Sequence, residues 1–156
     1  MSGDKKQRWV PLESNPDVLN KYIHNLGVPK DWEFVDVYGL DAELLMMVPR
    51  PVIAVMLLYP ITEQSESAEN KLGEEKQNVG GVYYMKQTVG NACGTVAVIH
   101  ALANNQNSIN FEDNKHFNKF LEDTLGKEPN EIANILENDS AMGAAHDDTA
   151  QEGQTE

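Results

Sequence analysis

Several segments of the chain carry apolar residues at the spacing of an amphipathic helix. The segment 16–26 follows Asn15, a favoured helix cap, and stops at a glycine. The segment 111–125 also ends at a glycine, and another helix begins at residue 129 with a proline. A brief helix is expected over 41–48, before two prolines. The pattern therefore predicts a chain with helices near both ends.

Other segments predict extended structure or none. The run 52–59 is continuously apolar and of strand length, as in a strand buried on both faces. Shorter strands or extended pieces are expected over 32–39 and 82–85. The segment 62–81 is polar and predicts a mobile loop. From residue 138 to 156 no apolar period remains, so a flexible acidic segment is expected.

Length and charge narrow the class of protein. A chain of 156 residues fits a single domain over 1–156, and one cysteine cannot form an internal disulfide. The longest apolar run is far shorter than the ~20 residues of a membrane span, so we expect a cytoplasmic protein without a membrane partner. The net charge of −13 argues against nucleic acid and favours a basic protein or peptide partner, although acidity can also serve only solubility.

The only cysteine, Cys93, precedes a helix-length apolar run. A helix N-terminus stabilises a thiolate through free N–H groups and the helix dipole, so Cys93 is a candidate nucleophile. Gly94 leaves room beside the sulfur for a substrate backbone. Gln87 lies just upstream, where its amide could donate to an oxyanion. A lone cysteine is also often an inert core residue, and spacing alone leaves both interpretations open.

A thiol nucleophile needs a general base, and none of the four histidines fits well. His100 lies seven residues beyond Cys93, about 10 Å along a helix axis, and is better interpreted as a partly buried structural residue. His24 and His116 lie on polar helix positions and are expected to be solvated. His146 falls in the expected flexible segment, so no fixed geometry with Cys93 is predicted.

The residues around Cys93 resemble the active-site signature of the ubiquitin carboxyl-terminal hydrolases. The matching positions are Gln87, Asn91-Ala-Cys93-Gly94 and Val98-Ile-His100-Ala-Leu-Ala103. Further segments are similar to the short cytosolic members of that family, in the same order: 7–13, 32–39, 47–51, 59–63 and 152–156. The resemblance covers essentially the whole chain.

The resemblance implies a papain-like α/β cysteine hydrolase fold, with a central antiparallel sheet flanked by helices and a knotted chain. It implies that Cys93 attacks the bond after the C-terminal glycine of ubiquitin, with Gln87 in the oxyanion hole. The residues implied to contact ubiquitin are Pro11, Leu12, Glu13, Ser14, Asn15, Pro16, Asp36, Ala150, Gln151, Glu152, Gly153, Gln154, Thr155 and Glu156. The ubiquitin tail is rich in arginine, which suits Glu13 and Asp36 as carboxylate partners. No cofactor or metal is implied.

The segment 138–156 corresponds by resemblance to the family's active-site crossover loop, which would limit leaving groups to small or unfolded adducts. The family's catalytic histidine and its orienting aspartate follow that loop, so both are expected beyond Glu156. The chain thus resembles the amino-terminal part of such an enzyme. It would either continue past a disordered or cleaved loop, which the composition favours, or be truncated and inactive alone.

A monomeric deubiquitinating thiol hydrolase is the main hypothesis, with NEDD8 as a further possible substrate. A non-catalytic ubiquitin-binding module and an unrelated papain-like peptidase are the alternatives.

Overall fold

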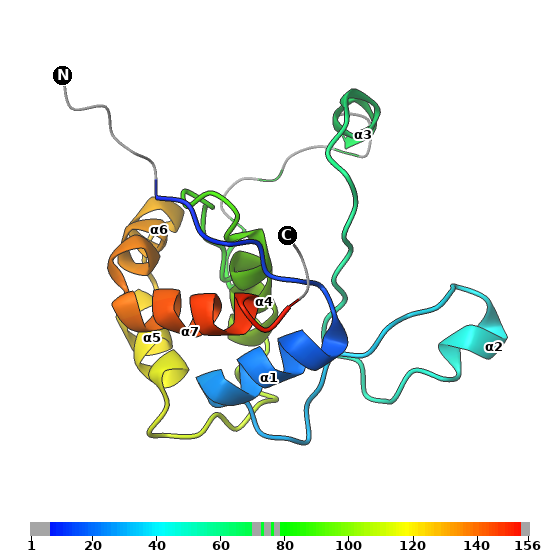
Figure 1. Cartoon of the computed structure of the whole chain (residues 1–156), viewed down its shortest axis with the longest axis horizontal. Helices are drawn as coiled ribbons and strands as arrows, with labels where there is room; N and C mark the ends of the chain where they lie inside the picture. The colour runs from blue at the N-terminus through cyan, green and yellow to red at the C-terminus, as the bar shows by residue number, and fades with distance from the viewer. Residues whose placement is uncertain (1–6, 70–72, 74–75, 77–78, 154–156) are drawn as a thin grey trace.

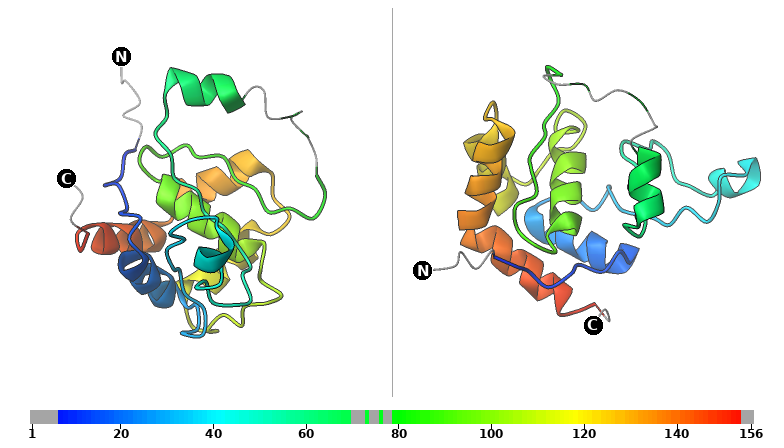
Figure 2. Two further views of the ribbon diagram at one scale, coloured as in Figure 1. Left: turned by 90° about the vertical axis from the view of Figure 1, so that its right-hand side faces the viewer. Right: turned by 90° about the horizontal axis from the view of Figure 1, so that it is seen from above.

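The computed structural model describes residues 7–69, 73, 76 and 79–153. Their helices are α1 (Pro16–Leu26), α2 (Ala42–Leu45), α3 (Glu63–Glu69), α4 (Cys93–Ala103), α5 (His116–Thr124), α6 (Pro129–Asn138) and α7 (Ser140–Ala150). Helix α7 packs against α1, α5 and α6, and α4 lies behind it (Figure 1). Helices α2 and α3 stand away from this group on long connections, as the turned views also show (Figure 2). None of the helices in the described ranges is long and apolar enough to cross a membrane.

Helix α1 forms where the sequence predicts it. The Asn15 side chain accepts a hydrogen bond from the Asp17 N–H at 2.9 Å, and Pro16 occupies the first turn. Gly27 ends the helix with a left-handed φ of 109°, which a side chain rarely adopts. The buried residues are Leu19, Tyr22, Ile23 and Leu26, which lie on one face and anchor the helix to the core.

Helix α4 is the most deeply packed element. Six of its eleven residues are buried, namely Thr95, Val96, Val98, Ile99, Leu102 and Ala103. Because apolar residues surround most of its circumference, it lies inside the core rather than on its surface. The prediction that a helix opens at Cys93 is confirmed.

One of the two helices predicted between residues 111 and 138 differs from its prediction in its start and its inward face, and the other begins where predicted. Helix α5 begins at His116 rather than at Phe111, because residues 111–115 form turns in which the Glu112 N–H donates to the Gly27 carbonyl at 2.9 Å. Leu125, expected to face inward, is 48% exposed. Helix α6 begins at Pro129 as predicted, with the Glu131 carboxylate accepting from the Glu128 N–H at 2.9 Å.

Helix α7 corrects the expectation of a flexible segment from residue 138. Asp139 caps the helix by accepting hydrogen bonds from the N–H groups of Ala141 and Met142. The buried residues Met142, His146, Thr149 and Ala150 fall at the i, i+4, i+7, i+8 spacing of one helical face. Two of them are polar, so the sequence showed no apolar period although the helix packs firmly.

The expected strands are not formed as strands. Among the described residues the only β-pairing is a parallel bridge between Arg8 and Gly90. In the run 52–59, Val55 is 81% and Leu57 80% exposed, so the prediction of a strand buried on both faces is wrong for this structure. A two-faced strand needs neighbours on both edges and layers on both faces, and none of the described elements supplies them.

Polar side chains of helices hold the other extended segments in place of a sheet. The Asn104 amide bonds both the N–H and the carbonyl of Tyr83, and His100 Nε2 accepts from the Met85 N–H at 3.1 Å. The Asn20 amide bonds the N–H and carbonyl of Phe34 in the same way. Both extended segments are thus fixed to a helix.

The polar segment 62–81 contains the helix α3, which the sequence analysis did not predict. The Thr62 side chain accepts from the Ser65 N–H at 3.1 Å, an N-terminal cap of the usual kind. Residues 70–72, 74–75 and 77–78 of the predicted loop lie outside the described residues. Its mobility stays a prediction.

Candidate active site

Cys93 is the first residue of α4, and its side chain is exposed. The first N–H groups of a helix have no partner within the helix itself. The sulfur therefore sits at an open helix N-terminus, while the preceding Ala92 is fully buried. Such a position combines access for a substrate with a fixed backbone.

The turn before Cys93 is held against the N-terminal segment. The Trp9 N–H donates to the Gly90 carbonyl at 2.9 Å, and the Gly90 N–H donates to the Gln7 carbonyl at 3.0 Å. Asn91 has a left-handed φ of 62°, and its amide donates to the Trp9 carbonyl at 3.0 Å. A Cβ at Gly90 would lie 3.1 Å from Cγ of Arg8, so glycine permits this close approach.

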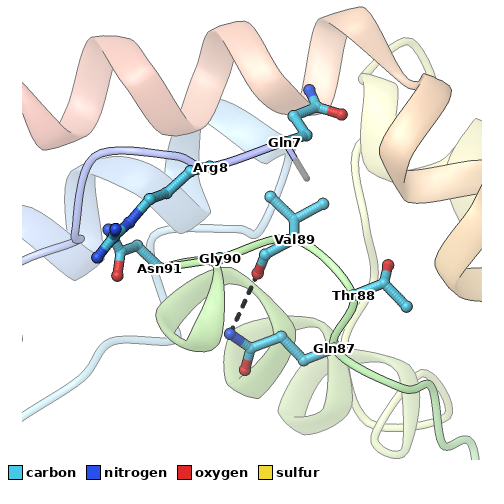
Figure 3. A pocket seen from close by; sticks show the side chains of 7 residues that line it. All are labelled: Gln7, Arg8, Gln87, Thr88, Val89, Gly90 and Asn91. Carbon is cyan, nitrogen blue, oxygen red and sulfur yellow. Dashed lines mark hydrogen bonds between the residues drawn. The ribbon is translucent and has the colours of Figure 1, made fainter. Parts of the chain in front are cut away.

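Gln87 lies at the rim of a pocket beside this turn. The pocket has a volume of about 450 Å³ and is lined by Gln7, Arg8, Gln87, Thr88, Val89, Gly90 and Asn91 (Figure 3). The Gln87 side chain is exposed, and its Nε2 donates to the Val89 carbonyl at 3.2 Å. The amide thus has one weak, local bond that an oxyanion could replace.

The candidate contact residues divide by exposure. Pro11, Ser14, Asn15 and Asp36 are exposed, whereas Leu12, Glu13 and Pro16 are half-buried. Leu12 lies against α4, since a Cβ at Gly94 would be 3.0 Å from the Leu12 Cβ. The space that Gly94 leaves open is therefore taken by Leu12 and not left for a substrate backbone.

The candidates at the end of the chain are partly engaged within the protein. Ala150 is only 5% exposed, and Glu152 forms an ion pair with Lys21 of α1. A Cβ at Gly153 would lie 2.8 Å from a carboxylate oxygen of Glu13. Gln151 is exposed, and 154–156 lie outside the described residues. The buried Ala150 is not available to a partner, which corrects its place in the predicted contact set.

The histidines do not reach Cys93 through any hydrogen bond within the part of the chain that the structure describes. His100 is half-buried and bonded to Met85, which confirms the structural role predicted for it, and burial lowers its pKa. His24 bonds the Trp32 carbonyl and His116 bonds the Asp139 carboxylate at 2.7 Å, so both are engaged rather than simply solvated.

His146 was the least well predicted of the four. Its ring is fully buried, with Nδ1 2.7 Å from Thr95 Oγ1 and Nε2 2.6 Å from the Val10 carbonyl oxygen. Burial lowers its pKa, against smaller raising effects of the Val10 bond and of Asp147. The Tyr22 hydroxyl lies 2.8 Å from Thr95 Oγ1, and burial raises the pKa of Tyr22.

This buried polar group was missed in the sequence because its members lie far apart. The available signal was the spacing of His146 with Met142 and Thr149 on one helical face, which becomes visible only when histidine and threonine are allowed in the core. Across the described ranges, no group of three or more histidine, cysteine or acidic side chains could hold a metal ion.

Comparisons with known proteins agree with the signature around Cys93. The family model "Ubiquitin carboxyl-terminal hydrolase, family 1" matches residues 9–156. The chain is 57% identical over 152 residues to a ubiquitin carboxyl-terminal hydrolase of Aplysia californica, covering 97% of this chain and 70% of that protein. It is 45% identical to a probable ubiquitin carboxyl-terminal hydrolase of Dictyostelium discoideum, covering 97% of this chain and 62% of that protein. It is 48% identical to the human isozyme L1, covering 92% of this chain and 66% of that protein.

The chain thus spans between about three fifths and seven tenths of the length of these relatives. Because the family model covers nearly all of its residues, the chain belongs to family 1 of the ubiquitin carboxyl-terminal hydrolases.

Proposed function

We propose that this chain carries the nucleophile of a cysteine-type ubiquitin hydrolase. One observation carries the proposal: Cys93 is an exposed thiol on the first residue of a buried helix, after a turn fixed by three backbone or amide bonds. A nucleophile must be reachable and yet held in one geometry, and this arrangement provides both. Relatives over nearly the whole chain are named for the same activity.

In the proposed reaction the Cys93 thiolate forms a C–S bond to the carbonyl carbon of the terminal glycine of ubiquitin. The carbonyl π electrons move to oxygen, and the resulting oxyanion accepts hydrogen bonds from the Cys93 N–H and the Gln87 amide. The intermediate expels the leaving group, which takes a proton from an acid. Water then hydrolyses the thioester and releases the ubiquitin carboxylate and the thiol.

The acid and base of this cycle fall to a histidine oriented by an aspartate, which the family resemblance places beyond Glu156. The histidines of this chain are poor substitutes, since each has a hydrogen-bonding partner of its own. His146 in particular is buried and has both ring nitrogens engaged. We therefore assign none of them the role of general base.

For substrate recognition we infer that the segment 11–16, Asp36 and residues from Gln151 onward contact ubiquitin, with NEDD8 as a possible second substrate. The chain's net charge of −13 suits an arginine-rich tail, and Asp36 is exposed. The crossover loop is assigned to residues after α7, because 140–150 are helical. Such a loop would restrict leaving groups to small or unfolded adducts.

We also infer a papain-like fold with a central antiparallel sheet and a knotted chain, acting as a cytoplasmic monomer. The apolar run 52–59 supports the sheet, because a segment so rich in exposed Val and Leu is suited to pairing with further strands. The sheet's neighbours would come from the share of the relatives' length that this chain does not span.

The proposal is tested by incubating the chain with ubiquitin that bears a C-terminal vinyl electrophile and measuring the intact mass. We expect one covalent adduct, absent in Cys93→Ala. The same reaction is run after adding the remaining part of the domain from the Aplysia californica relative, which supplies a base if one is lacking. Absence of an adduct under both conditions would overturn the proposed hydrolase activity. Binding of ubiquitin without an adduct under both conditions would favour a binding module.

A further inference from the structure

His146 closes a ring of hydrogen bonds around the start of the nucleophile helix. From Cys93 the ring runs two residues along α4 to Thr95, whose hydroxyl meets His146 Nδ1 at 2.7 Å. His146 Nε2 meets the Val10 carbonyl oxygen at 2.6 Å. The neighbouring Trp9 binds Gly90 and Asn91 through its backbone, and these residues lead back to Cys93.

The Thr95–His146 part of this ring of hydrogen bonds is buried. Thr95 and His146 are fully buried, and the Trp9 ring packs on the imidazole with 4.6 Å between ring centroids. Every buried side-chain polar atom in the described residues has a partner, so this ring contains no unsatisfied group. Buried, fully bonded polar groups fix one arrangement, because any alternative leaves a group without a partner.

The chemistry of the atoms fixes where the protons lie. A carbonyl oxygen can only accept, so His146 Nε2 carries the hydrogen that goes to Val10. In the neutral ring Nδ1 is then an acceptor, and the Thr95 hydroxyl donates to it. The Thr95 oxygen accepts in turn from the Tyr22 hydroxyl at 2.8 Å, and Tyr22 keeps its proton because burial raises its pKa. Each group therefore donates to the next in one direction, from Tyr22 through Thr95 and His146 to the Val10 carbonyl.

We propose that His146 is a positioning residue for Cys93, acting as a neutral Nε2–H imidazole through Thr95 on one side and Val10 on the other. This inference rests on the proposed function, because it assigns His146 a task in that reaction. His146 does not touch the reacting atoms. It holds the first turn of α4 and the segment that flanks the Cys93 turn at a fixed separation.

Two substitutions break the ring at different links. In His146→Gln the amide nitrogen reaches the position of Nε2 and keeps the donor to Val10, but the acceptor for Thr95 is lost. In His146→Asn the amide oxygen takes the place of Nδ1, and the donor to Val10 is lost. Thr95→Val removes the hydroxyl with little change in shape, and Thr95→Ser keeps it. His100→Asn is the matched control, since it removes the bond to Met85 from a half-buried histidine that lies outside the ring of hydrogen bonds.

The first measurement does not depend on activity. Nitrogen NMR of the His146 ring at neutral pH is expected to show a protonated Nε2 and an unprotonated Nδ1. Amide hydrogen exchange at 91–95 is expected to be about tenfold faster in His146→Asn, His146→Gln and Thr95→Val, but unchanged in His100→Asn and Thr95→Ser. The opposite tautomer of His146, or amide exchange accelerated equally in His100→Asn, would overturn the proposed ring of hydrogen bonds.

The second measurement follows the rate of adduct formation with the ubiquitin electrophile, in whichever condition gives the wild-type adduct. The maximal rate of inactivation is expected to fall on the order of 100-fold in the ring-breaking variants. The final amount of adduct should stay near wild type, whereas mere loss of folded protein would lower that amount and leave the rate alone. A wild-type rate in His146→Asn would overturn the positioning role. If the wild type forms no adduct, that result counts against the proposed function. The NMR and exchange measurements then decide whether the ring of hydrogen bonds through His146 exists.

Discussion

Thr95 Oγ1 and His146 Nδ1 lie 2.7 Å apart, although 51 residues separate them along the chain. The bond joins the helix that begins at Cys93 to the last helix of the described structure, and it is formed by a histidine that is fully buried. A buried neutral histidine makes the stability of the protein depend on pH.

The first prediction concerns that dependence. Burial holds the pKa of His146 below its ordinary value of 6.5, so the unfolded chain binds the proton more readily than the folded one. The stabilising contribution is complete above pH 6.5 and is lost as the pH falls from 6.5 toward the folded-state pKa. The titratable groups that act on these residues are Asp147 on α7, which raises the pKa of His146, the Tyr22 hydroxyl, which lies 2.8 Å from Thr95 Oγ1, and Asp139, which raises the pKa of Tyr22. Urea unfolding at pH 7.5 and pH 5.5 should show a lower free energy of unfolding in acid.

The matching variant for this experiment is His146→Asn, which removes the titration. Its free energy of unfolding should change less between the two pH values than that of the wild type. His100 contributes a slope of the same sign, since burial also lowers its pKa, so His146→Asn,His100→Asn should be flatter still. An undiminished slope in His146→Asn would show that this residue is not the sensor.

The second prediction uses two glycines with left-handed φ. Gly27→Ala places a Cβ 2.5 Å from the Lys115 Cβ, at a φ of 109°, whereas Gly126→Ala meets no atom within 4 Å, at a φ of 75°. The latter should cost about 1 kcal/mol for backbone conformation alone. The former should cost roughly 1–3 kcal/mol more, because the turn after α1 must move away from Lys115. Denaturant unfolding of both variants gives the comparison, and equal losses would refute the steric part.

The third prediction separates two roles of Asp139. Its Oδ1 caps α7 through the N–H groups of Ala141 and Met142, and its carboxylate also bonds His116 at 2.7 Å. Asp139→Ala should lower the free energy of unfolding by about 0.5–2 kcal/mol through loss of the cap. Asp139→Asn should lose much less, because asparagine caps as well as aspartate. Thermal unfolding followed by circular dichroism measures both, and indistinguishable variants would mean that the cap is not what stabilises α7.

The fourth prediction addresses the proposed oxyanion hole. Gln87→Ala should lower kcat for hydrolysis of a ubiquitin C-terminal amide on the order of 100- to 1000-fold with little change in KM, because the amide acts only on the developing oxyanion. The control is Thr88→Ala, an exposed neighbour lining the same pocket, which should behave as wild type. The assay uses the same combination of chain and added domain part that yields the wild-type adduct. A raised KM with unchanged kcat would assign Gln87 to binding instead.

Helices with local signals could be predicted from the sequence. Pro16–Leu26 has its cap, its proline and its terminal glycine within thirteen residues, and the structure places it there. Pro129–Asn138 has a similar start. Helix α7 has none of the large apolar residues that usually mark a buried face apart from Met142, so its packing on α1 could not be anticipated.

Strands and the deeper part of the site could not be predicted reliably because both depend on distant partners. The apolar run 52–59 has strand composition, but a strand forms only where a neighbour offers a ladder. The place of Cys93 at a helix start was readable from its flanking glycines and is confirmed. The contacts of His146 with Val10 and Thr95 span 136 and 51 residues, and no local pattern encodes such a meeting.

That spacing has a consequence for the order in which the protein is made. The ribosome synthesises the chain from the N-terminus, so residues 7–10 emerge before the Cys93 turn, and His146 emerges after both. A nascent chain can form α1 and bring α4 against it, but the imidazole that links Thr95 to Val10 is not yet present. The thiol therefore reaches its final setting only after α7 has been synthesised, and an incomplete product that stops before α7 would display Cys93 without the link through His146.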